Sequence, residues 1–249
     1  MENSNIKGTV RLYGTPAEEG GSGKVYLVRA GLFEDVDTAL HWHPSDRNSA
    51  NAETSLANKS ARFKFRGISS HAAAAPERGR SALDGVEAMN YMINMMREHV
   101  PQETRIHYVI TQGGEAPNVV PDFAEVYYYV RHPQAEELQE LWERVTDISQ
   151  AAALGTGTVV EVEVMHGNHS LLPNEKLSRQ MHANLTRLGG IRYNAEEQAF
   201  AEEISSSLGV GDFVGMEKEI LRFELRQGMG STDVGDVSWV VPTVGLCTS

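Results

Sequence analysis

The stretch "ARFKFRG", residues 61–67, alternates apolar and basic side chains, which is the pattern of a β-strand. The elements predicted after it are a long helix, two strands, a second helix and a last strand, at residues 81–100, 104–114, 124–132, 135–154 and 157–167. In the last strand "VVEVEV" alternates apolar and charged residues, as in a sheet covered on one face only. The order β-α-β-β-α-β is that of a ferredoxin-like sandwich, with a four-stranded antiparallel sheet and both helices on one face.

The residues on either side of this unit have a different pattern. Residues 6–14, 21–33 and 36–44 predict a strand, a helix and a strand, an order that favours a parallel sheet. The polar stretch 46–60 is predicted as a linker. From about Ser170 onward the chain is again rich in helix, and "GSTDVGDVSWVVPTVGLC" ends it with an apolar strand.

We therefore predict an α/β protein in which a ferredoxin-like α+β domain interrupts a parallel-sheet domain. The predicted boundaries are 1–58 and 168–249 for the two parts of the parallel-sheet domain and 59–167 for the inserted one. At 249 residues the chain is long enough for this division.

Composition excludes several classes of partner. The net charge is −12, so a nucleic acid or an anionic membrane is not expected to bind. The single cysteine, Cys247, excludes a disulfide framework and fits a reducing compartment. The first ten residues lack a basic-then-apolar leader, and no apolar run has the length of about 18 residues that a membrane span needs. These features predict a cytoplasmic protein.

The stretch "GTPAEEGGSGK", residues 14–24, raises a question of ligand charge. A phosphate loop requires a glycine six residues before its lysine and a hydroxyl residue after it. Glu18 and Val25 occupy those two positions, and the adjacent Glu18 and Glu19 would repel a phosphate. A charged turn between a strand and a helix, or a cation site, therefore remains.

The predicted strands place these glutamates beside a histidine. Glu18 and Glu19 follow the first predicted strand, and His43 ends the second. Ligands of open α/β sheets bind at the carboxyl ends of the strands. Two carboxylates and an imidazole there suit zinc or manganese, with one glutamate on the metal and the other taking a proton from metal-bound water. A merely packed strand-end histidine is the alternative.

Five motifs in this order resemble the zinc-dependent aminoacylase/carboxypeptidase family of amidohydrolases: "GTPAEEGGSGK", "ALHWHP", "GISSHAAAAPERGRSALD", "GEAPNVVPDFAEVYYYVR" and "GSTDVGDVSWVVPT". The resemblance covers nearly the whole chain. It implies a metal-binding catalytic domain interrupted by a ferredoxin-like lid that also dimerises. It further implies Glu18 as the general base, Glu19 as a metal ligand and His43 as a second ligand, with His41 less favoured.

The same resemblance assigns roles within the lid. His71 matches a histidine that reaches the active site of the partner protomer and polarises the scissile carbonyl, and Asn118 matches an asparagine near the substrate. Arg131 is a candidate for the substrate carboxylate because its planar fork suits one, or else an exposed strand-end arginine. Asp233 is assigned to substrate binding in a loop near the site; for it and Asp236, orienting a ligand and capping a helix remain alternatives.

The family draws further metal ligands from motifs upstream of the glutamates and near the C-terminus, and this sequence contains neither. We therefore expect an internal fragment. Two functions remain open. The first is hydrolysis of the amide bond of an N-acyl amino acid, such as aminobenzoyl-glutamate, by a homodimer with a divalent metal. The second is an inactive module that dimerises or binds through the lid.

Overall fold

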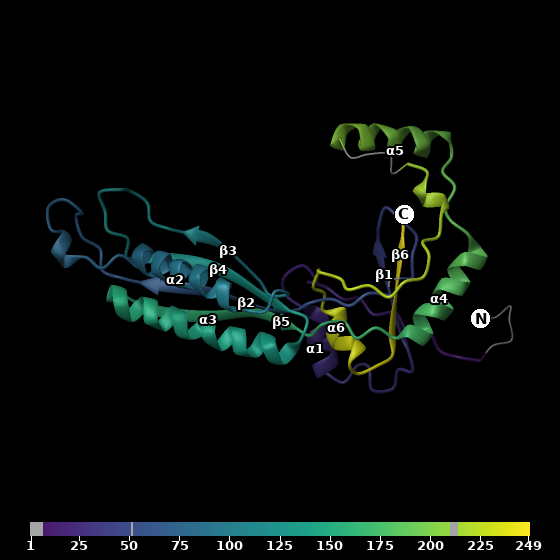
Figure 1. Cartoon of the computed structure of the whole chain (residues 1–249), viewed down its shortest axis with the longest axis horizontal. Helices are drawn as coiled ribbons and strands as arrows, with labels where there is room; N and C mark the ends of the chain where they lie inside the picture. Colours follow the sequence, from purple (N-terminus) through teal and green to yellow (C-terminus); the bar gives the residue numbers. More distant parts are fainter. Residues whose placement is uncertain (1–6, 51, 210–213) are drawn as a thin grey trace.

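The computed structural model describes residues 7–50, 52–209 and 214–249. Four strands form an antiparallel sheet in the order β3-β4-β2-β5, and two parallel strands form a second sheet, β1-β6. Figure 1 shows the larger sheet and two long helices at one end of an elongated molecule, with the smaller sheet at the other. The prediction of an α/β protein with an antiparallel and a parallel sheet is confirmed.

The larger sheet belongs to a unit at residues 57–168, which we call the lid. It consists of β2 (Ala57–Arg66), α2 (Ala82–Met96), β3 (Arg105–Gln112), β4 (Phe123–His132), α3 (Ala135–Thr156) and β5 (Val159–Asn168), with short 3₁₀ turns at Pro76–Arg78 and Arg97–His99. All its strand pairs are antiparallel. The ferredoxin-like order predicted from the sequence is therefore confirmed.

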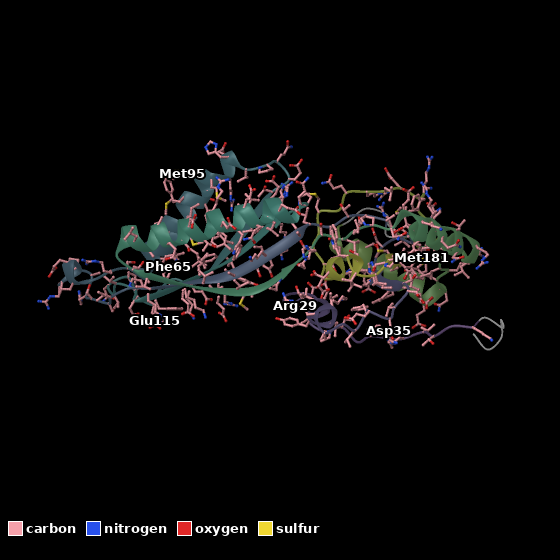
Figure 2. The ribbon with its side chains drawn as sticks, turned by 90° about the horizontal axis from the view of Figure 1, so that it is seen from below. Arg29, Asp35, Phe65, Met95, Glu115 and Met181 are labelled. Atoms are coloured by element: carbon pink, nitrogen blue, oxygen red, sulfur yellow. The ribbon has the colours of Figure 1, made fainter. Side chains whose placement is uncertain are left out.

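Both long helices cover the same face of this sheet. Phe63 and Phe65 point from β2 toward them and are fully buried, as is Tyr128 from β4. The ring of Phe63 meets Tyr128 edge-on at 5.8 Å between centroids and packs against Trp142 of α3. Figure 2 shows Phe65 beneath the helices and Met95 on the outer side of α2, where it is half exposed. The opposite face of the sheet carries no helix of the lid.

The described residues outside the lid form the parallel-sheet part. Its elements are α1 (Gly23–Arg29), β1 (Ala39–Pro44), α4 (Glu175–Leu188), α5 (Ala195–Leu208), a 3₁₀ turn (Met216–Lys218), α6 (Val234–Ser238) and β6 (Thr243–Thr248). Strands β1 and β6 run parallel, with His43 beside Cys247 at their carboxyl ends. None of the helices among the described residues is both long and apolar enough to span a bilayer.

The predicted first strand is wrong where it can be checked. Residues 7–14 have no strand, and Ile6 lies outside the described residues. Side chains dock this segment instead: Arg11 donates to both carboxylate oxygens of Asp35 at 2.8 Å. The hydroxyl of Tyr13 donates to the backbone oxygen of Leu32 at 2.7 Å. The segment thus lies against the loop after α1 without strand hydrogen bonds.

The predicted linker 46–60 is also too long. Strand β2 begins at Ala57, which pairs with His132 of β4, and Ala57, Asn58 and Ser60 are buried in the sheet. Isolated bridges tie the preceding residues to the C-terminal region, pairing Asn48 with Ile220 and Ser49 with Cys247. The division of the chain into domains at 58/59 and 167/168 stays a prediction.

Candidate functional site

The two candidate catalytic glutamates lie in a tight turn at residues 17–22, which we call the glutamate turn. Glu18 and Glu19 are exposed in it. Ala17 and Ser22, which bound the turn, both adopt left-handed backbone conformations, with φ of 61° and 52°. The amide of Gly21 donates to the carbonyl of Ala17 at 2.9 Å and closes the turn. Non-glycine residues rarely adopt left-handed backbone conformations, so the turn is strained and surrounding contacts must stabilise its backbone.

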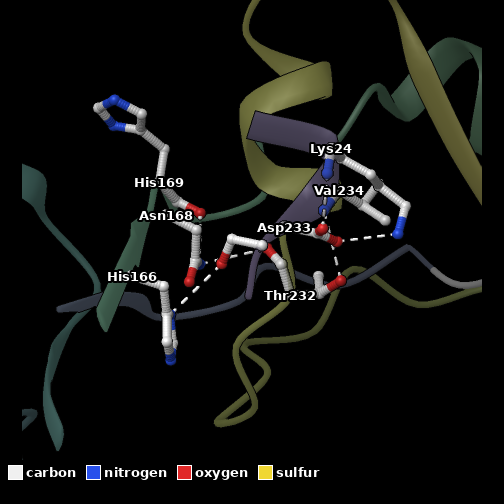
Figure 3. A network of polar contacts seen from close by, with 8 residues as sticks. Lys24, His166, Asn168, His169, Thr232, Asp233 and Val234 are labelled. Carbon is white, nitrogen blue, oxygen red and sulfur yellow. Dashed lines mark hydrogen bonds and ion pairs between the residues drawn. The ribbon is translucent and has the colours of Figure 1, made fainter. Parts of the chain in front are cut away.

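The segment after the turn does bind an anion, and that anion belongs to the chain itself. The backbone amide of Lys24 donates to one carboxylate oxygen of Asp233, and its ammonium group donates to the other, both at 2.9 Å. Asp233 is almost fully buried, and the side chain of Lys24 is largely so. Figure 3 shows this pair beside the residues that join β5 to the loop before α6. The glycine-rich stretch thus holds a carboxylate with Lys24, while its glutamates face outward.

Two histidines lie on β1 near its carboxyl end. His43 is exposed, and its Nδ1 lies 2.6 Å from the backbone oxygen of Pro44. If Nδ1 carries the proton that this contact requires, Nε2 keeps its lone pair, as in many metal-binding histidines. His41 is half-buried, and burial together with the positive charges of Lys24 and His43 lowers its pKa to about 4. Its Nε2 is buried with no hydrogen-bond partner among the described residues.

Glu19 and His43 have the donor types that a divalent metal such as zinc or manganese takes. Two protein ligands are fewer than the three that a catalytic zinc normally has. Across residues 7–50, 52–209 and 214–249, no three or more His, Cys, Asp or Glu side chains are grouped so as to hold a metal ion. The donors fit a metal by type and form an incomplete set.

His71 and Asn118 lie together at the far end of the lid. The backbone amide of Ala72 donates to the carbonyl of Asn118, and His71 forms a bridge with Val119. The Nδ1 of His71 accepts from the amides of Ala73 and Ala74 at 3.2 and 3.1 Å. The neutral ring therefore carries its proton on Nε2, directed away from these amides.

Arg131 lies at the opposite end of the lid sheet. It pairs with Asn58 at the start of β2, whereas the loop that carries His71 follows the end of β2. Ten strand residues separate the two ends, or about 30 Å. The structure thus divides the predicted site residues into two groups. Arg131 shares the end of the sheet next to the parallel-sheet part, and His71 and Asn118 form the distant pair.

The open face of the sheet near Arg131 carries aromatic rings. The guanidinium of Arg131 lies 5.3 Å from the centroid of the Tyr129 ring, and its buried Nε has no hydrogen-bond partner among the described residues. The Tyr129 hydroxyl lies 3.4 Å from Nε2 of His166 on β5. On the other side of that imidazole, Nδ1 lies 3.3 Å from the hydroxyl oxygen of Ser22. This chain of contacts joins the lid to the glutamate turn.

Electrostatics agrees with this proximity. Burial lowers the pKa of His166, the positive charge of Arg131 lowers it further, and the charge of Asp233 acts in the opposite direction. Burial and the hydrogen bond from Tyr127 raise the pKa of Tyr129 to about 12, and the charge of Glu19 adds to the increase. His166 is therefore predominantly neutral at pH 7, and Glu19 is close enough to the lid to act on Tyr129.

Asp236 orients backbone rather than standing free. Its carboxylate accepts from the amide of His169 at 2.9 Å, and burial raises its pKa.

Sequence reasoning overlooked Ser22, Lys24 and His166. Lys24 is the lysine of "GSGK", a pattern that points to a phosphate ligand and not to a carboxylate of the same chain. His166, in "VMHG", ends an alternating strand and had no motif to mark it. Its importance depends on a contact between residues 144 positions apart.

Comparison with known proteins covers the whole chain. A family described as a peptidase dimerisation domain matches residues 57–156. The chain is 41% identical over its full length to a subunit of the p-aminobenzoyl-glutamate hydrolase of Escherichia coli (strain K12), and it spans 57% of that subunit. It is 34% identical to the Xaa-Arg dipeptidase of Mus musculus, a match over 94% of this chain and 48% of that enzyme. The chain thus spans about half the length of these relatives, which are hydrolases.

Two solved structures share the fold. An aminobenzoyl-glutamate utilization protein from Klebsiella pneumoniae superposes with a TM-score of 0.63 at 19% identity, over 93% of this chain and 55% of that one. A Bacillus subtilis protein, a dinuclear metal binding peptidase from the M20 family, superposes with a TM-score of 0.53 at 17% identity, over 94% of this chain and 53% of that one. At these identities the likeness shows the fold alone.

Proposed function

The chain is a homologue of the M20 peptidases that carries their dimerisation domain, and on that premise we propose that it hydrolyses the amide bond of an N-acyl amino acid. Aminobenzoyl-glutamate is the proposed substrate. The observation that carries the proposal is the 41% identity, across the entire chain, with the Escherichia coli p-aminobenzoyl-glutamate hydrolase subunit. The single cysteine supports a reducing compartment, and we propose the cytoplasm.

In this proposal Glu19 and His43 hold a divalent metal, zinc or manganese. When bound, such an ion polarises a carbonyl and lowers the pKa of water toward about 7. Glu18 adjoins Glu19 in the same tight turn and is exposed, so its carboxylate would be accessible to a water molecule bound to a metal held by Glu19. Glu18 takes a proton from the attacking water and returns it to the leaving amine nitrogen as the amide bond breaks.

Arg131 supplies the proposed anchor for the substrate. A half-buried guanidinium with no carboxylate partner among the described residues can bind a substrate carboxylate through two parallel hydrogen bonds. The nearby neutral His166 does not compete with Arg131 for that anion. Asp233, in the loop before α6, is proposed to contribute to substrate binding indirectly, because both of its carboxylate oxygens already accept hydrogen bonds from Lys24.

His71 and Asn118 are proposed to act on the active site of a second protomer. The length of β2, about 30 Å, separates them from the end of the lid where Arg131 and the glutamate turn lie. A homodimer formed through the lid would bring them to the partner's substrate. There the Nε2–H of His71 would donate to the carbonyl oxygen as negative charge develops on it.

The test is release of p-aminobenzoate from aminobenzoyl-glutamate by the purified chain with added zinc or manganese. The Glu18→Gln variant should lose about 10²–10⁴-fold in kcat, because it removes the general base but keeps the shape. Glu34→Gln, at an exposed glutamate after α1, is the matched control and should retain activity. Hydrolysis that persists undiminished in Glu18→Gln, or its absence in the wild type with either metal, would reject the proposal.

A second candidate is a dimerising module without catalysis. The observation in its favour is that the lid has all six elements of its fold and a full core, whereas the candidate metal ligands form an incomplete set among the residues that the structure describes. Sedimentation of the wild-type chain distinguishes the candidates when combined with the activity assay. A dimer that neither binds metal nor hydrolyses substrate is the result expected of the module.

A further inference from the structure

We infer that Asp233 and His166 are positioning residues that hold the glutamate turn from two sides, Asp233 through Lys24 and His166 through Ser22. This inference rests on the proposed function, since it concerns how Glu18 and Glu19 are kept in place. Neither residue needs to touch the substrate in this role.

The turn cannot be held by its own backbone preferences. Ala17 and Ser22 occupy the left-handed region without being glycines, and relaxation of either would turn the chain at Glu18 and Glu19 in a new direction. Within the turn, the bond from Gly21 to Ala17 is the hydrogen bond that closes it. Strain of this kind persists only where neighbouring structure fixes the backbone, so the fixing contacts lie outside the turn.

Asp233 provides the first of these contacts. Its two oxygens accept from the amide and the ammonium group of Lys24, two residues beyond the turn. Asp233 is 1% exposed, so a substrate cannot reach its carboxylate, and the hydrogen bonds from Lys24 compensate its buried charge. Because the bond to the amide fixes backbone rather than a flexible side chain, it fixes the direction in which the chain leaves Ser22.

His166 provides the second contact, from the lid. Its Nδ1 meets the hydroxyl of Ser22, which is itself buried, and its Nε2 meets the hydroxyl of Tyr129. Tyr129 lies next to Arg131 on the same open face. The general base and the proposed carboxylate anchor are therefore connected through one imidazole. A shift of the lid relative to the turn would strain this contact.

Loss of either contact should lower kcat and leave the affinity for the substrate nearly unchanged. Glu18 acts in proton transfer, for which a misplacement of about 1 Å can cost about 100-fold in rate. Arg131, the proposed anchor for substrate, stays in place on its strand. The expected signature is thus a lower kcat with an unchanged KM, which a direct contact between Asp233 and substrate would not produce.

The main variant is Asp233→Asn, which keeps the size of the side chain and removes its charge. Asp37→Asn, at an exposed aspartate before β1, is the matched control. We expect kcat for aminobenzoyl-glutamate to fall about 100-fold, with KM within about twofold of wild type. A raised KM at unchanged kcat would overturn the inference, because it would assign Asp233 to the substrate.

A cycle with Lys24→Met separates the two routes further. If Asp233 acts through Lys24, the double variant Lys24→Met, Asp233→Asn should lose about as much kcat as the larger single variant. Losses that multiply would mean that the two residues act independently, contrary to the inference.

Amide hydrogen exchange tests the same inference without any activity. In Asp233→Asn, exchange across residues 14–24 should accelerate about tenfold or more, while exchange across residues 57–66 of β2 keeps its wild-type rate. His166→Phe should accelerate the same segment by a smaller factor. Unchanged exchange across residues 14–24 would overturn the inference, and so would equal acceleration in β2, which indicates general destabilisation. If the wild-type chain shows no hydrolysis, the proposed function is rejected. The exchange measurement then still decides whether Asp233 and His166 hold the glutamate turn.

Discussion

In the lid, twenty hydrophobic residues are buried in one cluster, whereas the corresponding cluster of the parallel-sheet part has three buried members, Phe33, Val237 and Val241. The lid has four hydrogen-bonded strands and the other part has two. Distant segments of the parallel-sheet part are joined instead by polar contacts, such as the one between Lys24 and Asp233. The lid is stabilised mainly by apolar burial, and the candidate site depends on a few specific polar bonds.

This difference predicts where a single substitution does the most damage. Phe63→Ala should destabilise the lid by about 3–5 kcal/mol, since it leaves a cavity between Tyr128 and Trp142 in a fully buried position. Urea unfolding followed by fluorescence, in a background that keeps Trp142 and replaces Trp42 and Trp239, measures the change. Tyr91→Ala, at an exposed aromatic residue of α2, is the control and should change stability by less than about 0.5 kcal/mol. Equal effects of the two substitutions would contradict the assignment of the core.

A substitution at Gly23 should affect the other region selectively. A Cβ at this position would lie 2.1 Å from the backbone oxygen of Pro16, so Gly23→Ala must displace the backbone that enters the glutamate turn. We expect a loss of about 1–3 kcal/mol in the parallel-sheet part, as for other overpacked sites. Two single-tryptophan backgrounds, one keeping Trp142 in the lid and one keeping Trp239 beside Ser170, report on the two regions separately.

If the two regions are stabilised separately, the unfolding transition reported by Trp239 shifts to a lower urea concentration and the transition reported by Trp142 does not. A common shift would mean that the two regions unfold as one unit and that the glutamate turn contributes to the stability of the lid. Gly155→Ala is the control, since a Cβ at this helical position meets no atom within 4 Å. It should not lower stability in either background.

The sequence predicted the lid well because its information is local. Alternation in "ARFKFRG" and "VVEVEV" marks two of its strands, β2 and β5, and the helix predicted from residue 81 begins beside its cap, Ser81. Residues 6–14 misled the same reasoning. Their apolar residues suggested a strand, but Leu12 is 95% exposed and the segment is docked by Arg11 and Tyr13. Periodicity reports a preferred shape and carries no information about whether a partner strand is present.

The sequence proposes residue types for the candidate site, which stay predictions, and contains no signal for the contacts that the structure shows around them. His43 follows from the rule that ligands bind at the carboxyl ends of strands, since it lies near the end of β1. Glu18 and Glu19 follow no strand among the described residues, so their assignment rests on residue type and the family resemblance. The pairing of Lys24 with Asp233 spans 209 positions and has no local signal. Its discovery required the fold. Asp233 was predicted to bind substrate because a motif gives a residue type and a neighbourhood, but it does not say which partner satisfies a buried charge.

The contact between the two regions should respond to pH. Burial and Arg131 hold the pKa of His166 below its ordinary value of 6.5, so the unfolded chain binds more protons than the folded chain just below that pH. The contribution of His166 to stability is therefore present above about pH 6.5 and is lost as pH falls through the lower, folded-state pKa. Urea unfolding from about pH 7.5 to about pH 5 measures the slope.

His166→Gln removes the titrating group and should flatten part of that slope. Some slope should remain, because His41 has a pKa of about 4 and contributes with the same sign. The groups that act on His166 are Arg131, which lowers its pKa, and Asp233, which raises it. A difference in stability between wild type and His166→Gln that is the same at every pH would show that this imidazole does not titrate differently on folding.

The smallest effect is expected at α5, which belongs to neither core. No residue of Ala195–Leu208, all of which the structure describes, is buried, and Figure 1 shows this helix at the upper edge of the molecule. Its start is held by Asn194, which accepts from the amides of Glu196 and Glu197 in a capping box. Asn194→Ala should cost about 1 kcal/mol of helix stability, visible as faster amide exchange within α5 only.

Asn174→Ala, at the cap of α4, is the matched comparison, because that helix buries Ser178 and Leu185 against its neighbours. Asn174→Ala should therefore also lower the stability of the protein toward global unfolding. If Asn194→Ala does the same, α5 unfolds cooperatively with the rest of the parallel-sheet part, contrary to this prediction.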